Sequence, residues 1–92
     1  MNNAEIALVF QDIADRLKSK KDNIFKIMAY ERVAKSIEEL PVSVEQLARE
    51  GRLREIPGVG EAITRKITEL VNTGRLEFYE KLKAESGGVK ND

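Results

Sequence analysis

The sequence predicts an all-α domain, a small bundle of four to five helices, from three observations. Apolar residues recur at three- and four-residue spacings along most of the chain, as they do on one face of an α-helix. No segment combines two-residue alternation with enrichment in β-branched residues, so no strand is expected. A length of 92 residues provides one hydrophobic core but not two. We therefore expect one domain over residues 1–85, followed by a flexible tail or the start of a linker over residues 86–92.

The first predicted helix spans residues 5–17. Asn2 or Asn3 precedes it and can accept a hydrogen bond from a free amide of the first turn, the usual role of an N-cap asparagine. Five apolar residues at helical spacing form the face that we expect to be buried: Ile6, Val9, Phe10, Ile13 and Leu17.

The second predicted helix follows the polar run KSKKD and ends before Pro41, because the residue before a proline disfavours the helical conformation. Asp22 is its expected N-cap. Its predicted buried stripe consists of Ile24, Ile27, Met28, Ala34 and Ile37.

Three shorter helices complete the expected bundle. Ser43, with Gln46 three residues later, has the form of a capping box, and Gly51 can end this third helix in the left-handed conformation. The fourth helix follows a glycine-bearing turn and stops at Gly74, and its apolar face consists of Ile63, Ile67, Leu70 and Val71. The fifth covers residues 76–83 and packs inward Leu76, Leu82 and either Phe78 or Tyr79.

Composition excludes several kinds of site. The chain has no cysteine and no histidine, which removes disulfides, the usual zinc ligands and serine-histidine triads. Lys plus Arg and Asp plus Glu both number 16, so a basic surface can arise only if the fold gathers cations on one face. No apolar run approaches the roughly 20 residues of a membrane helix, and acids interrupt the first segment, unlike a secretory signal. We expect a cytoplasmic protein that does not bind membranes.

The stretch LREIPGVGEAITRKI places Pro57, Gly58 and Gly60 within four consecutive positions. The glycines allow another molecule to approach the backbone closely, and free amides at the start of the next helix attract phosphate. Val59 can point inward and anchor the turn. The pattern fits neither G-x-G-x-x-G nor G-x-x-x-x-G-K-[ST], and no strand precedes it, which disfavours nucleotide-cofactor binding. A tight connection between packed helices would use the same residues, so both interpretations stay open.

The same stretch resembles the helix-hairpin-helix motif, which binds the DNA backbone without sequence specificity in many repair proteins. A longer similarity covers residues 6–82: FKIMAYERVAKSIEELP, the hairpin and KITELVNTGRL follow the order and spacing of the amino-terminal 8-kDa domain of polymerase beta-like, family X DNA polymerases. The resemblance implies a monomeric domain of a bacterial or archaeal repair polymerase. Such a domain binds gapped, nicked or single-stranded DNA independently of sequence and grips its 5′-phosphate.

In some family members this domain also removes 5′-deoxyribose phosphate through a lysine Schiff base, a step of base excision repair. The resemblance makes Lys66 the catalytic candidate, and a solvated or phosphate-contacting lysine is the alternative. Arg65 beside it, and partial desolvation against Ile63 and Leu70, would favour the neutral amine that attacks the sugar aldehyde.

The resemblance also implies phosphate contacts. Lys26 and Tyr30 lie one turn apart on the second helix and match positions that hold the phosphate, although Tyr30 would equally suit a core-edge aromatic with its hydroxyl in water. Arg54 matches a basic phosphate-contacting position. Together with the hairpin, the expected DNA or phosphate contacts are Phe25, Lys26, Tyr30, Arg54, Gly58, Val59, Gly60, Arg65 and Lys66.

No organic cofactor is expected. In related domains K⁺ or Na⁺ sits on hairpin carbonyls, which would here belong to Arg54, Ile56 and Val59, and carbonyl oxygens suit such hard cations. The polymerase reaction needs Mg²⁺ held by palm-domain aspartates, and we expect that domain to lie outside these 92 residues.

Three positions depart from the polymerase beta pattern: Ala62 replaces a lysine, Phe25 a histidine and Arg65 a glutamate. Loss of a cation and of an acid-base group favours phosphate binding over efficient lyase chemistry, while Phe25 can still stack on a base. A third interpretation is a helical adaptor that binds another protein, which would have an exposed apolar patch away from the hairpin.

Overall fold

The structure, a computed structural model, describes the backbone of residues 1–90 and the side chains of residues 1–85. Within this part of the chain there are helices and turns but no strand, which confirms the predicted all-α class. The elements in order are α1 (Asn3–Ser19), α2 (Ile24–Glu38), α3 (Val44–Arg49), the short 3-10 helix η1 (Leu53–Glu55), α4 (Glu61–Thr73) and α5 (Glu77–Lys90).

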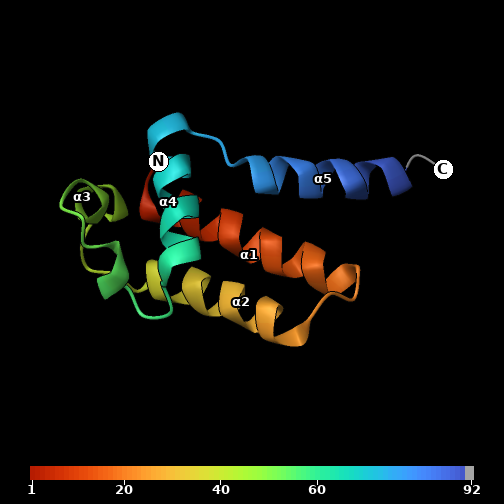
Figure 1. The fold of residues 1–92 in the computed structure, drawn as a ribbon, viewed down its shortest axis with the longest axis horizontal. Helices are drawn as coiled ribbons and strands as arrows, with labels where there is room; N and C mark the ends of the chain where they lie inside the picture. The colour runs from red at the N-terminus through yellow and green to blue at the C-terminus, as the bar shows by residue number, and fades with distance from the viewer. Residues whose placement is uncertain (91–92) are drawn as a thin grey trace.

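The helices are arranged around an antiparallel pair. α1 and α2 lie side by side, α4 crosses them near one end, and α5 lies alongside α1 and runs in the same direction (Figure 1). α3 and η1 lie at the same end as α4, so the connection between η1 and α4 reaches the C-terminal half of α2 (Figure 1). None of the described helices is long and apolar enough to cross a membrane.

Two helix N-termini are capped at the predicted residues. The Asn2 side chain accepts a hydrogen bond from the Glu5 amide (2.8 Å), and the Glu5 carboxylate accepts one from the Asn2 amide (2.9 Å), so the two form a capping box. Ser43 Oγ accepts a hydrogen bond from the Gln46 amide (3.3 Å). The Gln46 side chain does not return this bond but donates to Glu50, so only half of the predicted box forms.

The N-cap predicted for α2 is wrong by one residue. The Asn23 side chain accepts a hydrogen bond from the Phe25 amide (2.8 Å), while Asp22 accepts one from the Asn23 amide (2.6 Å). The reason lies at the end of α1. Lys21 takes a left-handed φ of 60°, and the Asp22 amide donates back to the Leu17 carbonyl (2.9 Å). Asp22 therefore belongs to the turn that closes α1, and Asn23 stands before the next helix.

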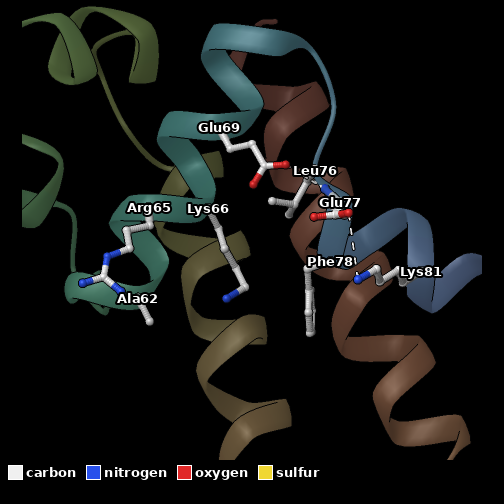
Figure 2. Close-up of a pocket in the computed structure, with 8 residues that line it drawn as sticks. All are labelled: Ala62, Arg65, Lys66, Glu69, Leu76, Glu77, Phe78 and Lys81. Carbon is white, nitrogen blue, oxygen red and sulfur yellow. Dashed lines mark hydrogen bonds and ion pairs between the residues drawn. The ribbon is translucent and has the colours of Figure 1, made fainter.

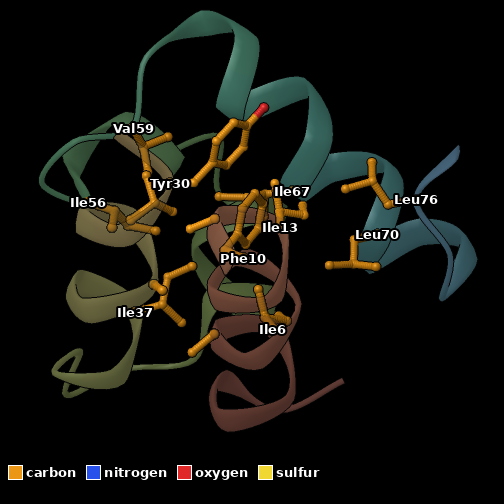
Figure 3. Packing of buried hydrophobic residues seen from close by; sticks show 14 of the residues in the cluster. Ile6, Phe10, Ile13, Tyr30, Ile37, Ile56, Val59, Ile67, Leu70 and Leu76 are labelled. Carbon is orange, nitrogen blue, oxygen red and sulfur yellow. The ribbon is translucent and has the colours of Figure 1, made fainter. Parts of the chain in front are cut away.

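The core contains side chains from every α-helix and from the hairpin (Figure 3). Within the described residues no polar or charged residue is buried. The residues that fill the centre of this cluster include Ile6, Phe10, Ile13, Tyr30, Ile37, Ile56, Val59, Ile67, Leu70 and Leu76. Burial of each large apolar side chain stabilises the fold by about 1.5–3 kcal/mol.

The predicted buried face of α2 is partly wrong. Ile24 and Met28 are 56% and 54% exposed. The buried stripe runs instead through Ile27, Tyr30, Val33, Ala34 and Ile37. Each residue turns a helix by about 100°, so Met28 lies beside this stripe, not on it. Apolar character alone could not separate the two faces.

Two predicted helix ends are confirmed and one is not. Gly51 and Gly74 take left-handed φ values of 69° and 76°, which allows a helix to end there. α5 continues to Lys90, whereas the sequence predicted an end at Lys83. A formed helix can propagate one hydrogen bond per residue without an apolar face, and no proline stops it. The predicted tail over residues 86–92 thus begins on α5, and residues 91–92 lie outside the described residues.

A polar contact at the edge of the core joins α5 to α1. The Tyr79 hydroxyl donates to Asp12 Oδ2 (2.6 Å), and Arg16 Nε donates to the same oxygen (2.8 Å). Partial burial would raise the pKa of the Asp12 carboxyl, but hydrogen bonds from Arg16 and Tyr79 outweigh it and hold that pKa below its ordinary value. Burial, together with the Asp12 carboxylate, raises the pKa of Tyr79 to about 12.

Tyr79→Phe should lower the free energy of unfolding by about 1 kcal/mol near neutral pH, because it removes a hydrogen bond to a carboxylate. The folded-state pKa of Asp12 is depressed. Its contribution is therefore fully present above the ordinary pKa of 3.8 and is lost as pH falls through the lower folded-state pKa. Urea denaturation should show the stability gap between wild type and variant narrowing as the solution is acidified.

The matched control is Tyr30→Phe, whose hydroxyl donates to no protein group within the described residues. It should change the free energy of unfolding by less than about 0.5 kcal/mol throughout the range from neutral to acidic pH. A gap for Tyr79→Phe that does not change with acidification would contradict the assigned coupling to Asp12.

Candidate nucleic-acid interface

Residues 56–60 form the hairpin that joins η1 to α4. The side chains of Ile56 and Val59 are buried, with 1% and 7% exposure, whereas Gly58 and Gly60 are exposed. The Val59 amide donates to the Ile56 carbonyl (3.0 Å) and is therefore used within the turn. The hairpin points its apolar side chains into the core and its glycine backbone outward.

The two glycines of the hairpin differ in what the fold demands of them. Gly58 has a φ of +89°, and a Cβ at this position would lie 3.2 Å from Cγ and Cδ of Arg32. Gly60 has an extended backbone (φ −106°, ψ −161°), and a Cβ there would meet nothing within 4 Å. The described structure therefore requires a glycine at position 58 but not at position 60.

The N-terminus of α4 has no side-chain cap, because its N-cap residue is Gly60. The first amides of this helix carry the positive end of the helix dipole. Glu61 lies in this first turn and forms ion pairs with Arg65 and with Arg54, the latter at 3.9 Å. Both arginine side chains are largely exposed, at 75% and 63%. An anion at these amides would meet two cations and one competing carboxylate.

Arg32 is a further cation at the hairpin, and sequence reasoning missed it. Its aliphatic carbons lie against Gly58, and the residue is exposed. Arg32 belongs to α2, so only the crossing of the helices brings it to the turn. No local pattern around Arg32 distinguishes it from the other basic residues of α2.

The Lys66 side chain lies on a different side of α4 from the Arg65 side chain (Figure 2). It borders a cavity of about 380 Å³ between α4 and α5. Figure 2 shows the Lys66 side chain reaching toward Phe78 while the Arg65 side chain points away. Lys66 Nζ is 4.9 Å from the centroid of the Phe78 ring, a cation–π contact worth about 0.5–1 kcal/mol at a partly exposed site. The residues that line the cavity are Ala62, Arg65, Lys66, Glu69, Leu76, Glu77, Phe78 and Lys81.

This contact changes the electrostatic expectation for Lys66. The sequence suggested that Arg65 and desolvation would favour the neutral amine. Nζ instead lies over the face of the Phe78 ring, in a cation–π contact that the sequence did not predict.

The three candidates on α2 have different environments. Phe25 is 77% exposed and available for stacking. The side chain of Lys26 is 45% exposed and lies 3.8 Å from Asp22. Lys26 is in the first turn of α2, about 9 Å along the helix from Arg32, where the hairpin makes contact. The described contacts do not bring Lys26 together with the hairpin cations.

Tyr30 is part of the core and only 6% exposed. Its ring lies between those of Phe10 and Phe78, with centroid distances of 6.1 and 6.0 Å. Burial raises the pKa of its phenol. Its hydroxyl has no described protein partner, yet no buried side-chain polar atom in this part of the chain lacks one, so the hydroxyl reaches solvent. The alternative of a core-edge aromatic describes this residue well.

The three hairpin carbonyls expected to hold a monovalent cation, those of Arg54, Ile56 and Val59, differ in their hydrogen bonding. Because Pro57 has no amide hydrogen, the Arg54 carbonyl lacks the donor that would follow it in a 3-10 turn. Among the described residues the Arg54 and Val59 carbonyls accept no backbone hydrogen bond outside helices, and the Ile56 carbonyl accepts one. The same residues contain no cluster of three acidic, histidine or cysteine side chains that could hold a metal ion.

Comparison with known proteins links the chain to one family. A family model described as a helix-hairpin-helix domain matches residues 1–76, which include the hairpin and all of α1 to α4. None of the curated proteins compared matches the chain.

Alanine substitutions at the two hairpin glycines should separate their roles. Gly58→Ala should lower the free energy of unfolding by about 1–3 kcal/mol, because alanine is strained at positive φ and its Cβ crowds Arg32. Gly60→Ala should cost only about 0.5 kcal/mol, the preference for glycine over alanine at an N-cap. Equal losses for both variants in urea denaturation would contradict this assignment.

Proposed function

The chain belongs to the helix-hairpin-helix domain family, and we propose that it binds the backbone and the 5′-phosphate of gapped or nicked DNA without reading base sequence. Membership of this family itself points to nucleic-acid binding. We further propose that the domain serves a family X DNA repair polymerase. The segments FKIMAYERVAKSIEELP and KITELVNTGRL, which flank the hairpin at the spacing of that family, support this assignment.

The main observation behind the proposal is that position 60 is a glycine although the fold does not require one there. This residue is exposed, its backbone is extended, and a Cβ would meet no protein atom within 4 Å. Glycine also provides no side-chain acceptor that could cap the first turn of α4. Glycine leaves those amides open to a phosphate oxygen, which both the hydrogen bonds and the helix dipole favour.

Charges around the hairpin support the same conclusion. Arg32 contacts Gly58, and Arg54 and Arg65 both reach Glu61 at the start of α4. Cations from two helices and η1 therefore lie beside the hairpin and the start of α4. Contacts of this kind orient a protein on a sugar-phosphate strand but carry no sequence information.

We propose that a potassium or sodium ion assists this contact from the carbonyls of Arg54, Ile56 and Val59. Pro57 supports the proposal, since it leaves the Arg54 carbonyl without its turn donor. A cation at these oxygens would add a positive charge beside the backbone phosphate. Phe25, with 77% exposure, would stack on an unpaired base.

The proposal predicts opposite effects of two neighbouring substitutions on DNA affinity. Gly60→Ala should weaken binding to a gapped duplex with a 5′-phosphate by about tenfold, the equivalent of one lost phosphate contact. Glu61→Gln should strengthen binding by about threefold, because it releases Arg54 and Arg65 and removes a repelling charge. Fluorescence anisotropy at fixed salt measures both.

Two comparisons make this experiment decisive. Glu85→Gln removes the same charge from the Lys20 pair, remote from the hairpin, and should leave affinity unchanged. Wild type should prefer the phosphorylated gap to the unphosphorylated one, with an affinity that falls steeply with salt. Equal and negligible binding to both duplexes would reject the proposed function.

A second candidate function is a 5′-deoxyribose-phosphate lyase, and the cavity beside Lys66 favours it. Its volume of about 380 Å³ is ample for a sugar. In this reaction Lys66 Nζ would attack the C1′ aldehyde and form an imine with release of water. Loss of a C2′ proton would then break the C3′–O bond, and the leaving phosphate would become the new 5′ end of the DNA.

Borohydride trapping on an incised abasic site tests this second candidate. Lys66→Ala should lower the trapped product by about tenfold or more, because imine formation needs its amine. Lys81→Ala is the matched control, since Lys81 lines the same cavity. If Lys66→Ala traps as well as wild type, Lys66 is not the nucleophile.

A further inference from the structure

We infer that Phe78 is a positioning residue for Lys66: its ring holds the Lys66 ammonium at the edge of the α4–α5 cavity and so favours phosphate binding over imine formation. The Lys66 Nζ lies 4.9 Å from the ring centroid (Figure 2). This inference rests on the proposed function, because the anion that Lys66 would contact is the DNA phosphate.

Aromatic stacking fixes the position of the Phe78 ring. The ring stacks on Tyr30 at 6.0 Å with an angle of 14° between the ring planes. Tyr30 in turn stacks on Phe10 at 6.1 Å and 17°. Phe10 is fully buried, so the stack is fixed at the centre of the core. Three rings from three helices thus present one aromatic face to Lys66.

The backbone around Phe78 is also fixed relative to α4. Glu69 Oε2 accepts a hydrogen bond from the Glu77 amide (2.8 Å) and so caps α5 from a residue of α4. Leu76 is 1% exposed and anchors the chain just before this helix. Because Glu69 lies less than one turn from Lys66, the same short stretch of α4 sets the positions of the cation and of the ring.

The aromatic face distinguishes between the two forms of the lysine. Its negative quadrupole attracts an ammonium ion, whereas a neutral amine gains little from it. An ammonium ion binds phosphate, but only the neutral amine can attack an aldehyde. The other charged groups that line the cavity are Arg65, Glu69, Glu77 and Lys81, with two positive and two negative charges that balance formally. The ring is therefore the group that holds the Lys66 ammonium in place, and Nζ must leave this contact before it can attack an aldehyde.

The test replaces Phe78 with side chains that fill a similar volume. Phe78→Leu and Phe78→Met remove the aromatic face, and Phe78→Tyr retains it. Both ring-free variants should weaken binding to a 5′-phosphorylated gap by about two- to fivefold and raise borohydride trapping by a similar factor. Phe78→Tyr should behave like wild type in both assays.

A spectroscopic measurement checks the position of Lys66 without DNA. In wild type the ε-methylene protons of Lys66 should resonate upfield of those of exposed lysines, because they lie in the ring current of Phe78. The upfield shift should vanish in Phe78→Met and persist in Phe78→Tyr. Leu82→Met, a core substitution on the same helix, should leave the shift, the binding and the trapping unchanged.

The outcomes separate this inference from the proposed function. Wild type that ignores the 5′-phosphate would reject the proposed function, while the proton shift and the trapping ratio would still test Phe78. Wild type that prefers the phosphate, together with ring-free variants that bind and trap like wild type, would overturn the role of Phe78 alone. If Phe78→Leu fails to fold, Phe78→Met decides, since its flexible side chain fills a similar space.

Discussion

Burial of Ile56 and Val59 is the constraint on which the hairpin depends. Both side chains enter the core, with 1% and 7% exposure, and each stabilises the fold by about 1.5–3 kcal/mol. Because these two residues flank the turn, their burial forces Pro57 and Gly58 outward. The positive φ of Gly58 and the hydrogen bond from the Val59 amide to the Ile56 carbonyl follow from the sharpness of that turn. The outward-facing backbone is thus a consequence of core packing.

Core packing also determines the structure beside Lys66. Phe10 of α1, Tyr30 of α2 and Phe78 of α5 stack in sequence, and the last ring meets the Lys66 ammonium of α4. Aromatic stacking of this kind adds about 0.5–1.5 kcal/mol per pair beyond area burial. The position of the Lys66 ammonium therefore depends on four helices. Arg65 both lines the cavity beside Lys66 and pairs with Glu61 beside the hairpin, and the same core positions both sites.

Local signals in the sequence predicted much of this fold. Asn2, Ser43, Gly51 and Gly74 act where helix caps and stops were expected, because such residues interact with backbone within one turn. The face of α2 was harder to predict, since the apolar Ile24 and Met28 compete with the true core stripe. Contacts between helices could not be predicted, because they leave no local pattern in the sequence. Arg32 lies beside the hairpin and Phe78 contacts Lys66 only because of the way the helices cross. The sequence predicted the hairpin from its glycines. Only the structure shows that a Cβ would be strained at Gly58 but would meet no nearby atom at Gly60.

The chain has 16 basic and 16 acidic residues, and one of the acids, Glu61, lies directly after the hairpin, in the first turn of α4. In the structure, which contains no DNA, Glu61 forms ion pairs with Arg54 and Arg65. A phosphate that binds these arginines would therefore have to displace the Glu61 carboxylate. A backbone phosphodiester, with one negative charge, replaces a carboxylate of equal charge and gains little from the exchange. A terminal phosphate monoester carries a charge of about −1.5 to −2 at neutral pH and gains more. The carboxylate would thus suppress binding along intact duplex and leave strand ends as the favoured site, a selectivity that a uniformly basic hairpin would not provide.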